Sequence, residues 1–193
     1  KRVVTSAFAA ADCPPFYFGG EMGTVCYGDD LGHCNDSILG LGSAISSMLY
    51  HTERDVLVII TRLHMMAQYK LTDNKPSQLL KCKLSVGKEG LMDAIWAGPG
   101  QLALVSADQV VRFSDLTNDD NYVLSLADVP GMEEHANDKL VTLAHHRGKN
   151  MLAGGTREGR ILVWKRSPNA PTDSAEKSWT PLAPVELGSP ADH

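Results

Sequence analysis

Cysteine and histidine side chains near the N-terminus are the first candidates for chemistry, because proteins bind zinc through thiolate sulfur and imidazole nitrogen. The residues in question are Cys13, Cys26, His33 and Cys34. Structural zinc sites usually bring their cysteines in pairs a few residues apart, and this spacing matches no such pattern. A buried cysteine without a metal is also common. We therefore expect no metal site and no stoichiometric zinc.

Catalytic groups are the second candidates. Neighbouring carboxylates occur at Asp29-Asp30, Asp119-Asp120 and Glu133-Glu134, but adjacent residues of a strand point to opposite faces and do not share a site. The glycine-rich runs at 40–45 and 154–159 each lack one glycine of a dinucleotide-binding fingerprint, and no helix is expected after either. The sequence contains neither G-x-S-x-G nor H-E-x-x-H. We therefore expect no enzyme active site and no cofactor.

Charge is unevenly distributed along the second half of the chain. Residues 108–138 hold eight acids and one base, a net charge of −7, whereas residues 139–166 hold seven bases and one acid, a net charge of +6. Four of these bases flank two expected turns, so we expect them to be exposed at loop tips where an acidic partner can reach them. The alternative is that the basic segment neutralises the acidic one. The four candidate partner-binding residues are Arg147, Lys149, Arg157 and Arg160.

Overall charge and hydropathy exclude other classes of protein. The 193 residues carry a formal net charge of −5, whereas a nucleic-acid binder needs a basic surface that displaces counterions from phosphates. No apolar run approaches the roughly 20 residues of a membrane-spanning helix, the longest being 55–60. The four cysteines form no C-x-x-C pair and do not resemble a secreted disulfide framework. The sequence predicts no nucleic-acid partner, no transmembrane segment and a reducing compartment.

The elements that would position these side chains recur along the chain. Short apolar stretches bounded by Gly, Asp, Asn and Pro predict four hairpins, each a strand, a turn and a strand. The second strand of each hairpin carries an aromatic residue, at intervals of 42, 44 and 51 residues, close to the roughly 40 to 45 residues of a WD repeat. These aromatic residues are Tyr27, Tyr69, Phe113 and Trp164.

A further short strand precedes each hairpin and another follows it, which gives four strands per repeat, as in a propeller blade. The sequence therefore predicts an all-β fold, namely a WD40-type β-propeller of about four four-stranded antiparallel blades that form part of a larger propeller. The Gly-His pair and the structural hydrogen-bond set of a full WD repeat are absent, so the repeats are degenerate. The expected blades span 1–41, 42–86, 87–128 and 139–187, with loop insertions at 128–138 and 167–181.

One aromatic residue falls inside an expected loop. The stretch from Ser167 to Pro184 is rich in Pro, Ser and Ala and has too few large apolar residues to form a core of its own. It contains Trp179. Because a large aromatic side chain is usually buried, we expect Trp179 to pack back on a blade, the alternative being contact with a partner.

Three segments, at 19–41, 53–71 and 149–166, resemble the intraflagellar transport protein 140 family, whose members are WD-repeat and TPR subunits of intraflagellar transport complex A. The likeness includes the GDDLGHC turn at 28–34 and the Ser/Pro-rich loop before Trp179, and it covers nearly the whole chain. The resemblance implies a protein with two propellers, and we expect this chain to come from the N-terminal one.

The resemblance implies a non-catalytic scaffold and protein-interaction module that supports retrograde ciliary transport and the entry of membrane proteins into cilia. It implies partners among the other WD-repeat and TPR subunits of the complex and among ciliary membrane-protein cargo adaptors. The implied locations are the cilium, the ciliary base or basal body, and the cytoplasm. Two alternatives stay open: a coat-type adaptor of vesicle traffic, and a propeller-based hydrolase or lyase with His, Asp or Glu converging near the central channel.

Overall fold

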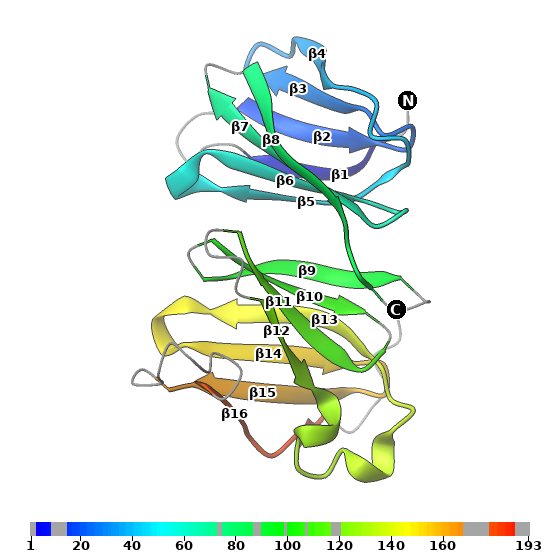
Figure 1. The fold of residues 1–193 in the computed structure, drawn as a ribbon, viewed down its shortest axis with the longest axis vertical. Helices are drawn as coiled ribbons and strands as arrows, with labels where there is room; N and C mark the ends of the chain where they lie inside the picture. The colour runs from blue at the N-terminus through cyan, green and yellow to red at the C-terminus, as the bar shows by residue number, and fades with distance from the viewer. Residues whose placement is uncertain are drawn as a thin grey trace. The chain divides into compact units, whose positions relative to one another are not determined.

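In the computed structural model of the chain, the described strands form four antiparallel β-sheets, and the strands of each sheet pair in the order in which they occur in the sequence (Figure 1). The structure describes residues 3–8, 15–72, 75–86, 90–98, 100–106, 108–116, 121–167 and 178–187. Helical structure in these ranges is limited to single 3-10 turns, so the predicted all-β class is confirmed. The sheets divide between two compact units, residues 1–85 and 86–193.

The first unit contains two four-stranded sheets. Their facing side chains form one hydrophobic core, which includes Tyr17, Ile45, Leu57, Ile59 and Tyr69. The strands of the first sheet are β1 (Val3–Phe8), β2 (Pro15–Gly20), β3 (Val25–Asp29) and β4 (Cys34–Ile38), and those of the second are β5 (Ile45–His51), β6 (Val56–Thr61), β7 (Met65–Thr72) and β8 (Lys75–Lys83).

The second unit repeats this arrangement with one difference. In its last sheet the outer position is shared by two short strands, β16 and β17, which both pair with β15. Between them residues 182–184 lie opposite only Leu162 and Val163 of β15, so the register shifts by one residue, as in a β-bulge. The strands are β9 (Leu91–Gly98), β10 (Gln101–Ser106), β11 (Val110–Asp115), β12 (Asn121–Ser125), β13 (Leu140–His146), β14 (Met151–Thr156), β15 (Arg160–Arg166), β16 (Trp179–Pro181) and β17 (Val185–Glu186).

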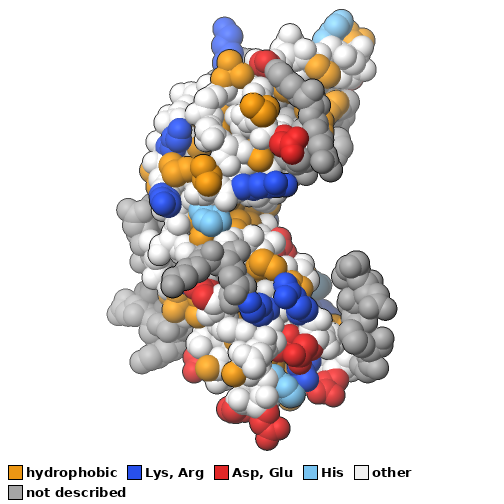
Figure 2. Space-filling view, turned by 90° about the vertical axis from the view of Figure 1, so that its right-hand side faces the viewer, with side chains coloured by type: hydrophobic (Ala, Val, Ile, Leu, Met, Phe, Trp, Pro, Cys, Tyr) orange, Lys and Arg blue, Asp and Glu red, His pale blue; other side chains and the backbone are white. Residues whose placement is uncertain are grey.

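The second strand of a sheet can be buried along its whole length. Every residue of β6 and of β10 is buried, because such a strand is paired at both edges and packed on both faces. This explains why period-two alternation is weak in these two segments of the sequence. Unlike these buried strands, the outer surface carries several types of side chain. Figure 2 shows basic, acidic and hydrophobic side chains interspersed on the face that it draws.

The first strand of every sheet carries an irregularity close to its start. Its pairing with the second strand shifts register by one residue, as in a β-bulge, which increases the local twist. Because the shift recurs in all four described sheets, it belongs to the repeat, although composition and spacing do not reveal it. The extra residues are Val4, Ser46, Met92 and Val141.

In the second unit a carboxylate links the first strands of the two sheets. Asp93 Oδ2 accepts hydrogen bonds from Thr142 Oγ1 at 3.0 Å and from Leu143 N at 2.8 Å. Its Oδ1 accepts from Ala94 N at 2.8 Å. Asp93 on β9 therefore holds β13 just after the irregular residue Val141.

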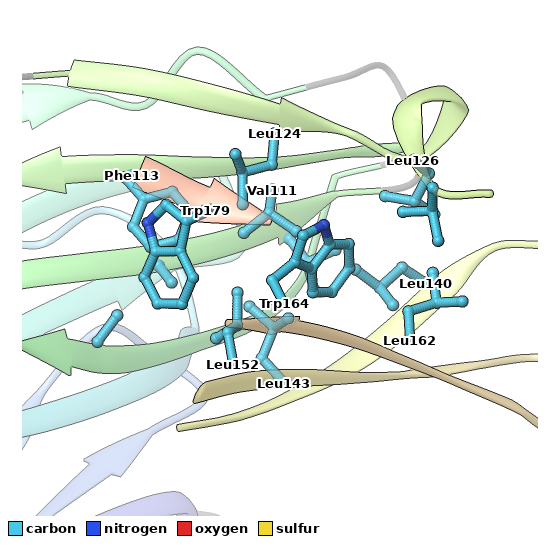
Figure 3. Close-up of a cluster of buried hydrophobic side chains, with 14 of the residues drawn as sticks. Val111, Phe113, Leu124, Leu126, Leu140, Leu143, Leu152, Leu162, Trp164 and Trp179 are labelled. Atoms are coloured by element: carbon cyan, nitrogen blue, oxygen red, sulfur yellow. The ribbon is translucent and has the colours of Figure 1, made fainter. Parts of the chain in front are cut away.

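Trp179 packs on the neighbouring sheet, as predicted. Its ring lies 5.5 Å from that of Phe113, and its Nε1 donates a hydrogen bond to Tyr122 Oη at 2.9 Å; Figure 3 shows Phe113 and Trp179 together in the buried cluster. This anchor makes Trp179–Pro181 a strand, so the expected loop at 167–181 is wrong for these three residues. Residues 168–177 of that loop lie outside the described ranges.

The expected loop insertion at 128–138 consists largely of 3-10 turns. The turn η2 (Leu126–Asp128) leads into it, and η3 (Glu133–His135) lies inside it. Successive backbone hydrogen bonds link residues three apart, from Val129 N to Leu126 O through to Asp138 N to His135 O. Leu126, Val129 and Met132 are buried in the core of the second unit. Their spacing of three is the period of a 3-10 helix.

Candidate partner-binding surface

The turn between β13 and β14 carries the first two predicted basic residues. Arg147 and Lys149 begin and end the 3-10 turn η4 (Arg147–Lys149), and both are exposed, as expected. His146 Nδ1 accepts a hydrogen bond from Lys149 N at 3.2 Å. Asn150 then closes the turn with φ 50°, a left-handed conformation that asparagine tolerates better than most residues. The local sequence thus fixes the backbone from which the two basic side chains extend.

The same turn occurs between β5 and β6. There the 3-10 turn η1 (Thr52–Arg54) follows His51, and Asp55 closes it with φ 52°. Asp55 N bonds to Thr52 O at 3.4 Å, and the equivalent Asn150 N bonds to Arg147 O at 3.3 Å. A histidine followed four residues later by Asp or Asn marks both turns, and this signal could have identified them from the sequence.

A shallow, open depression of about 740 Å³ lies beside Arg147 and Lys149. Ala144, Ala153 and Val163 lie opposite one another across β13, β14 and β15, so they share one face of the sheet. This face is turned away from the hydrophobic core of the unit. Arg147 and Lys149 form a basic rim beside this apolar floor.

His145 lines the same depression but adds no positive charge to its rim at neutral pH. Burial lowers the pKa of His145, and electrostatic interactions with Arg166, His146 and Arg147 lower it further. A histidine with a lowered pKa is neutral at pH 7. The basic character of this rim therefore rests on Arg147 and Lys149.

The other two predicted residues lie at the opposite end of the hairpin. Arg157 is exposed in the turn between β14 and β15, and Arg160 is the first residue of β15. The six residues of β14 separate this turn from η4, a span of roughly 20 Å. The structure therefore does not bring the four basic residues together into one patch.

The expectation that Arg160 is exposed at a loop tip is wrong. Its side chain is only 13% exposed, and its Nη1 donates to Asp138 Oδ2 at 2.8 Å and to Glu158 Oε2 at 2.7 Å. Glu186 Oε1 lies 3.6 Å from its Nε. Hydrogen bonds to Glu158 and Asp138 raise the pKa of Arg160. For this residue the alternative interpretation holds, since a base of the basic segment neutralises an acid of the acidic one.

The residues weighed for metal binding and catalysis do not converge where the structure describes them. Cys26 Sγ donates to Asp36 Oδ1 at 3.1 Å, whereas His33 Nδ1 contacts Asp29 Oδ2 at 3.0 Å in an exposed turn. In the described ranges no three His, Cys, Asp or Glu side chains are placed to share a metal ion. Cys13 and Asp119-Asp120 lie outside those ranges.

In the described residues no helix has the length and apolarity needed to cross a membrane.

Comparison with protein families gives a match over almost the entire chain. A family model described as the IFT140 first β-propeller matches residues 2–193. The preference for the N-terminal propeller is confirmed by this match.

Solved structures of low sequence identity share the fold. The Cps50 (Swd1) β-propeller domain of Myceliophteria thermophila is 15% identical, with a TM-score of 0.74 over 97% of this chain and 56% of that one. A chain of the mitotic checkpoint complex is 17% identical, with a TM-score of 0.68 over 97% and 52%. The WD40 repeats of RRP9 are 14% identical, with a TM-score of 0.63 over 95% and 53%. The chain thus has the WD40 propeller fold and spans about half the length of these matched chains.

Proposed function

Because the chain belongs to the family of IFT140 first β-propellers, we propose that it is a non-catalytic interaction module of the intraflagellar transport A complex. The family match over residues 2–193 carries this proposal. The proposed module supports retrograde ciliary transport and the ciliary entry of membrane proteins, in the cilium, at its base and in the cytoplasm. The architecture supports such a role, because rigid antiparallel sheets present their connecting loops as contact surfaces.

The proposed partners are the other WD-repeat and TPR subunits of that complex and ciliary membrane-protein cargo adaptors. Within the module, the turn with Arg147 and Lys149 is the proposed contact for an acidic surface of one of these partners. Exposure of both side chains in the turn between β13 and β14 supports this assignment. Arg157 is a separate proposed contact at the other end of the hairpin, and Arg160 has a structural role.

Charge reversal in the full-length protein tests the proposed contact. The double variant Arg147→Glu/Lys149→Glu should weaken co-precipitation of one subunit and make the residual binding less sensitive to salt, because complementary charges on both sides give an interface its salt dependence. The fold should persist, since exposed substitutions typically change stability by less than about 0.5 kcal/mol each. Lys81→Glu/Lys83→Glu, at exposed lysines of β8, is the matched control. Full recovery of every subunit at low and high salt would refute the contact.

Localisation and activity of the tagged full-length protein distinguish the proposed function from the two alternatives, a coat-type adaptor and a propeller-based enzyme. The proposal requires co-purification with the complex and a ciliary signal. A signal on Golgi membranes without the complex would favour a coat-type adaptor. Turnover in a broad hydrolase screen, abolished by substituting a residue of this region, would favour an enzyme.

A further inference from the structure

We propose that the outer edge of β8 binds an extended, acidic segment of another subunit of the complex as an additional β-strand. The inference rests on the proposed function and adds a contact on the first unit, remote in sequence from Arg147 and Lys149. Strand addition takes its affinity from main-chain hydrogen bonds along a free sheet edge and its specificity from the side chains beside that edge.

The free edge of β8 is long for a propeller. β8 ends the strand order β5-β6-β7-β8, so in the described part of the chain it pairs with β7 on one side only. It has nine residues, whereas the outer strands β4 and β12 have five each and β16 has three. Propellers keep such edges short and protected. The length of β8 departs from this rule, and an added strand would protect its edge.

Further blades of a propeller do not occupy this edge. Blades pack on the faces of one another's sheets, as the two sheets of the first unit do through their common core, and hydrogen bonding along the outer strand stays available. β8 pairs with β7 in two regular halves, Lys75–Gln78 and Leu80–Lys83, on either side of the extra residue Leu79. The first half contains Pro76, which has no N–H to donate. The half that can pair regularly with an added strand is therefore Leu80–Lys83.

The charge of β8 indicates what kind of strand can bind. The strand contains three exposed lysines, Lys75, Lys81 and Lys83, and no acid. Lys81 and Lys83 are two positions apart, so both side chains lie on the same face of the strand. Like charges opposite one another oppose pairing with a second copy of β8, whereas an acidic strand is attracted. On the other face Leu80 is 43% exposed and offers an apolar contact.

Photo-crosslinking of the full-length protein in the reconstituted complex tests the inference. A photoreactive phenylalanine analogue in place of Leu80 should crosslink to an acidic segment of one other subunit, with a yield that falls as salt rises, because salt screens opposite charges. The same analogue at Val123, an exposed residue of the outer strand β12, which contains no lysine, is the control and should not crosslink to that segment. Adducts with lipid alone, or no adduct in an assembled complex, would overturn the inference.

Hydrogen exchange distinguishes an added strand from a purely ionic contact. Backbone amides of residues 80–83 should exchange more slowly in the assembled complex than in the free protein, because an added strand accepts hydrogen bonds from the free edge. Amides of residues 121–125 on β12 should exchange equally fast in both. Equal exchange of residues 80–83 in the free and assembled protein would rule out strand addition.

Charge reversal provides the third measurement. With the analogue at Leu80, Lys81→Glu/Lys83→Glu should lower the crosslink yield about tenfold, because like charges then face one another. Lys81→Arg/Lys83→Arg keeps both charges and should retain the yield. Neither pair should alter recovery of the subunit that depends on Arg147 and Lys149, so the first pair remains the control for that contact. A wild-type yield from the charge-reversed variant refutes the β8 contact alone. A wild-type protein that does not enter the complex refutes the proposed function and this inference with it.

Discussion

A single buried carboxylate organises one end of the last sheet. Asp138 is almost completely buried, and its side chain accepts hydrogen bonds from Glu158 N at 3.0 Å and from Arg160 Nη1 at 2.8 Å. A buried charge is tolerated only when it is paired and hydrogen-bonded. Asp138 therefore fixes both the turn before β15 and the position of Arg160.

Removal of this carboxylate should destabilise the fold. Asp138→Ala leaves the Glu158 amide without its acceptor and the Arg160 guanidinium with Glu158 but not Asp138 as an acceptor, and hydrogen bonds to a charged group contribute about 1.5–3 kcal/mol. We expect the free energy of unfolding of the complete propeller to fall by roughly 2 kcal/mol, measured by urea denaturation. Arg157→Ala, in the same turn but exposed, should change it by less than about 0.5 kcal/mol. Equal effects of the two variants would contradict the role of Asp138.

These residues also show which side-chain environments the sequence can predict. Arg147 and Lys149 are exposed as expected, because the turn that holds them is determined by neighbouring residues. Arg160 is not exposed, and its environment was not predictable because its partner Asp138 lies 22 residues earlier in the chain. A partner at that distance is brought in by the tertiary fold, and the local pattern contains no sign of it.

At the scale of elements, the two sheets of the first unit approach closely where β2 passes β5. A Cβ added at Gly19 would lie 2.8 Å from both Cβ and Cγ2 of Ile45. Gly19→Ala should therefore lower the free energy of unfolding by about 1–3 kcal/mol, as overpacking of a core does. Gly148→Ala is the control, because its nearest neighbour would be His146 at 3.5 Å, an ordinary contact. A Gly19→Ala variant as stable as the control would show that the sheets separate easily.

The strands were predictable because each hairpin is specified by turn residues and apolar strands within a few positions of one another. Elements whose conformation depends on packing were not. Trp179–Pro181 form β16 because the Trp179 ring packs on Phe113, a contact far away in sequence. Leu126, Val129 and Met132 did offer a local signal, a spacing of three, which polar composition obscured.

At the scale of the whole molecule, the last sheet has a face that no described strand of its own unit covers. Ala144, Ala153 and Val163 lie on it, beside the open depression. Outer strands such as β8 and β12 also have one edge without a partner strand in the sheet order. Exposed apolar faces and unpaired edges favour association between molecules.

We therefore expect the 193-residue chain, expressed alone, to aggregate or to unfold over a broad temperature range. Calorimetry and light scattering on the same sample measure both properties. Co-expression with the remainder of the first propeller should give a monodisperse species with a sharp transition. A sharp, cooperative transition of the isolated monomer would instead indicate a self-sufficient fold.

The bridge formed by Asp93 has a mechanical consequence. Thr142 Oγ1 and Leu143 N both donate to the same carboxylate oxygen, at 3.0 and 2.8 Å. A force that slides β13 along β9 must stretch both bonds at once, whereas a force that peels the strands apart from one end can break neighbouring contacts in turn. Resistance of this joint to load therefore depends on the direction of pulling, and shear is the direction in which it is strongest.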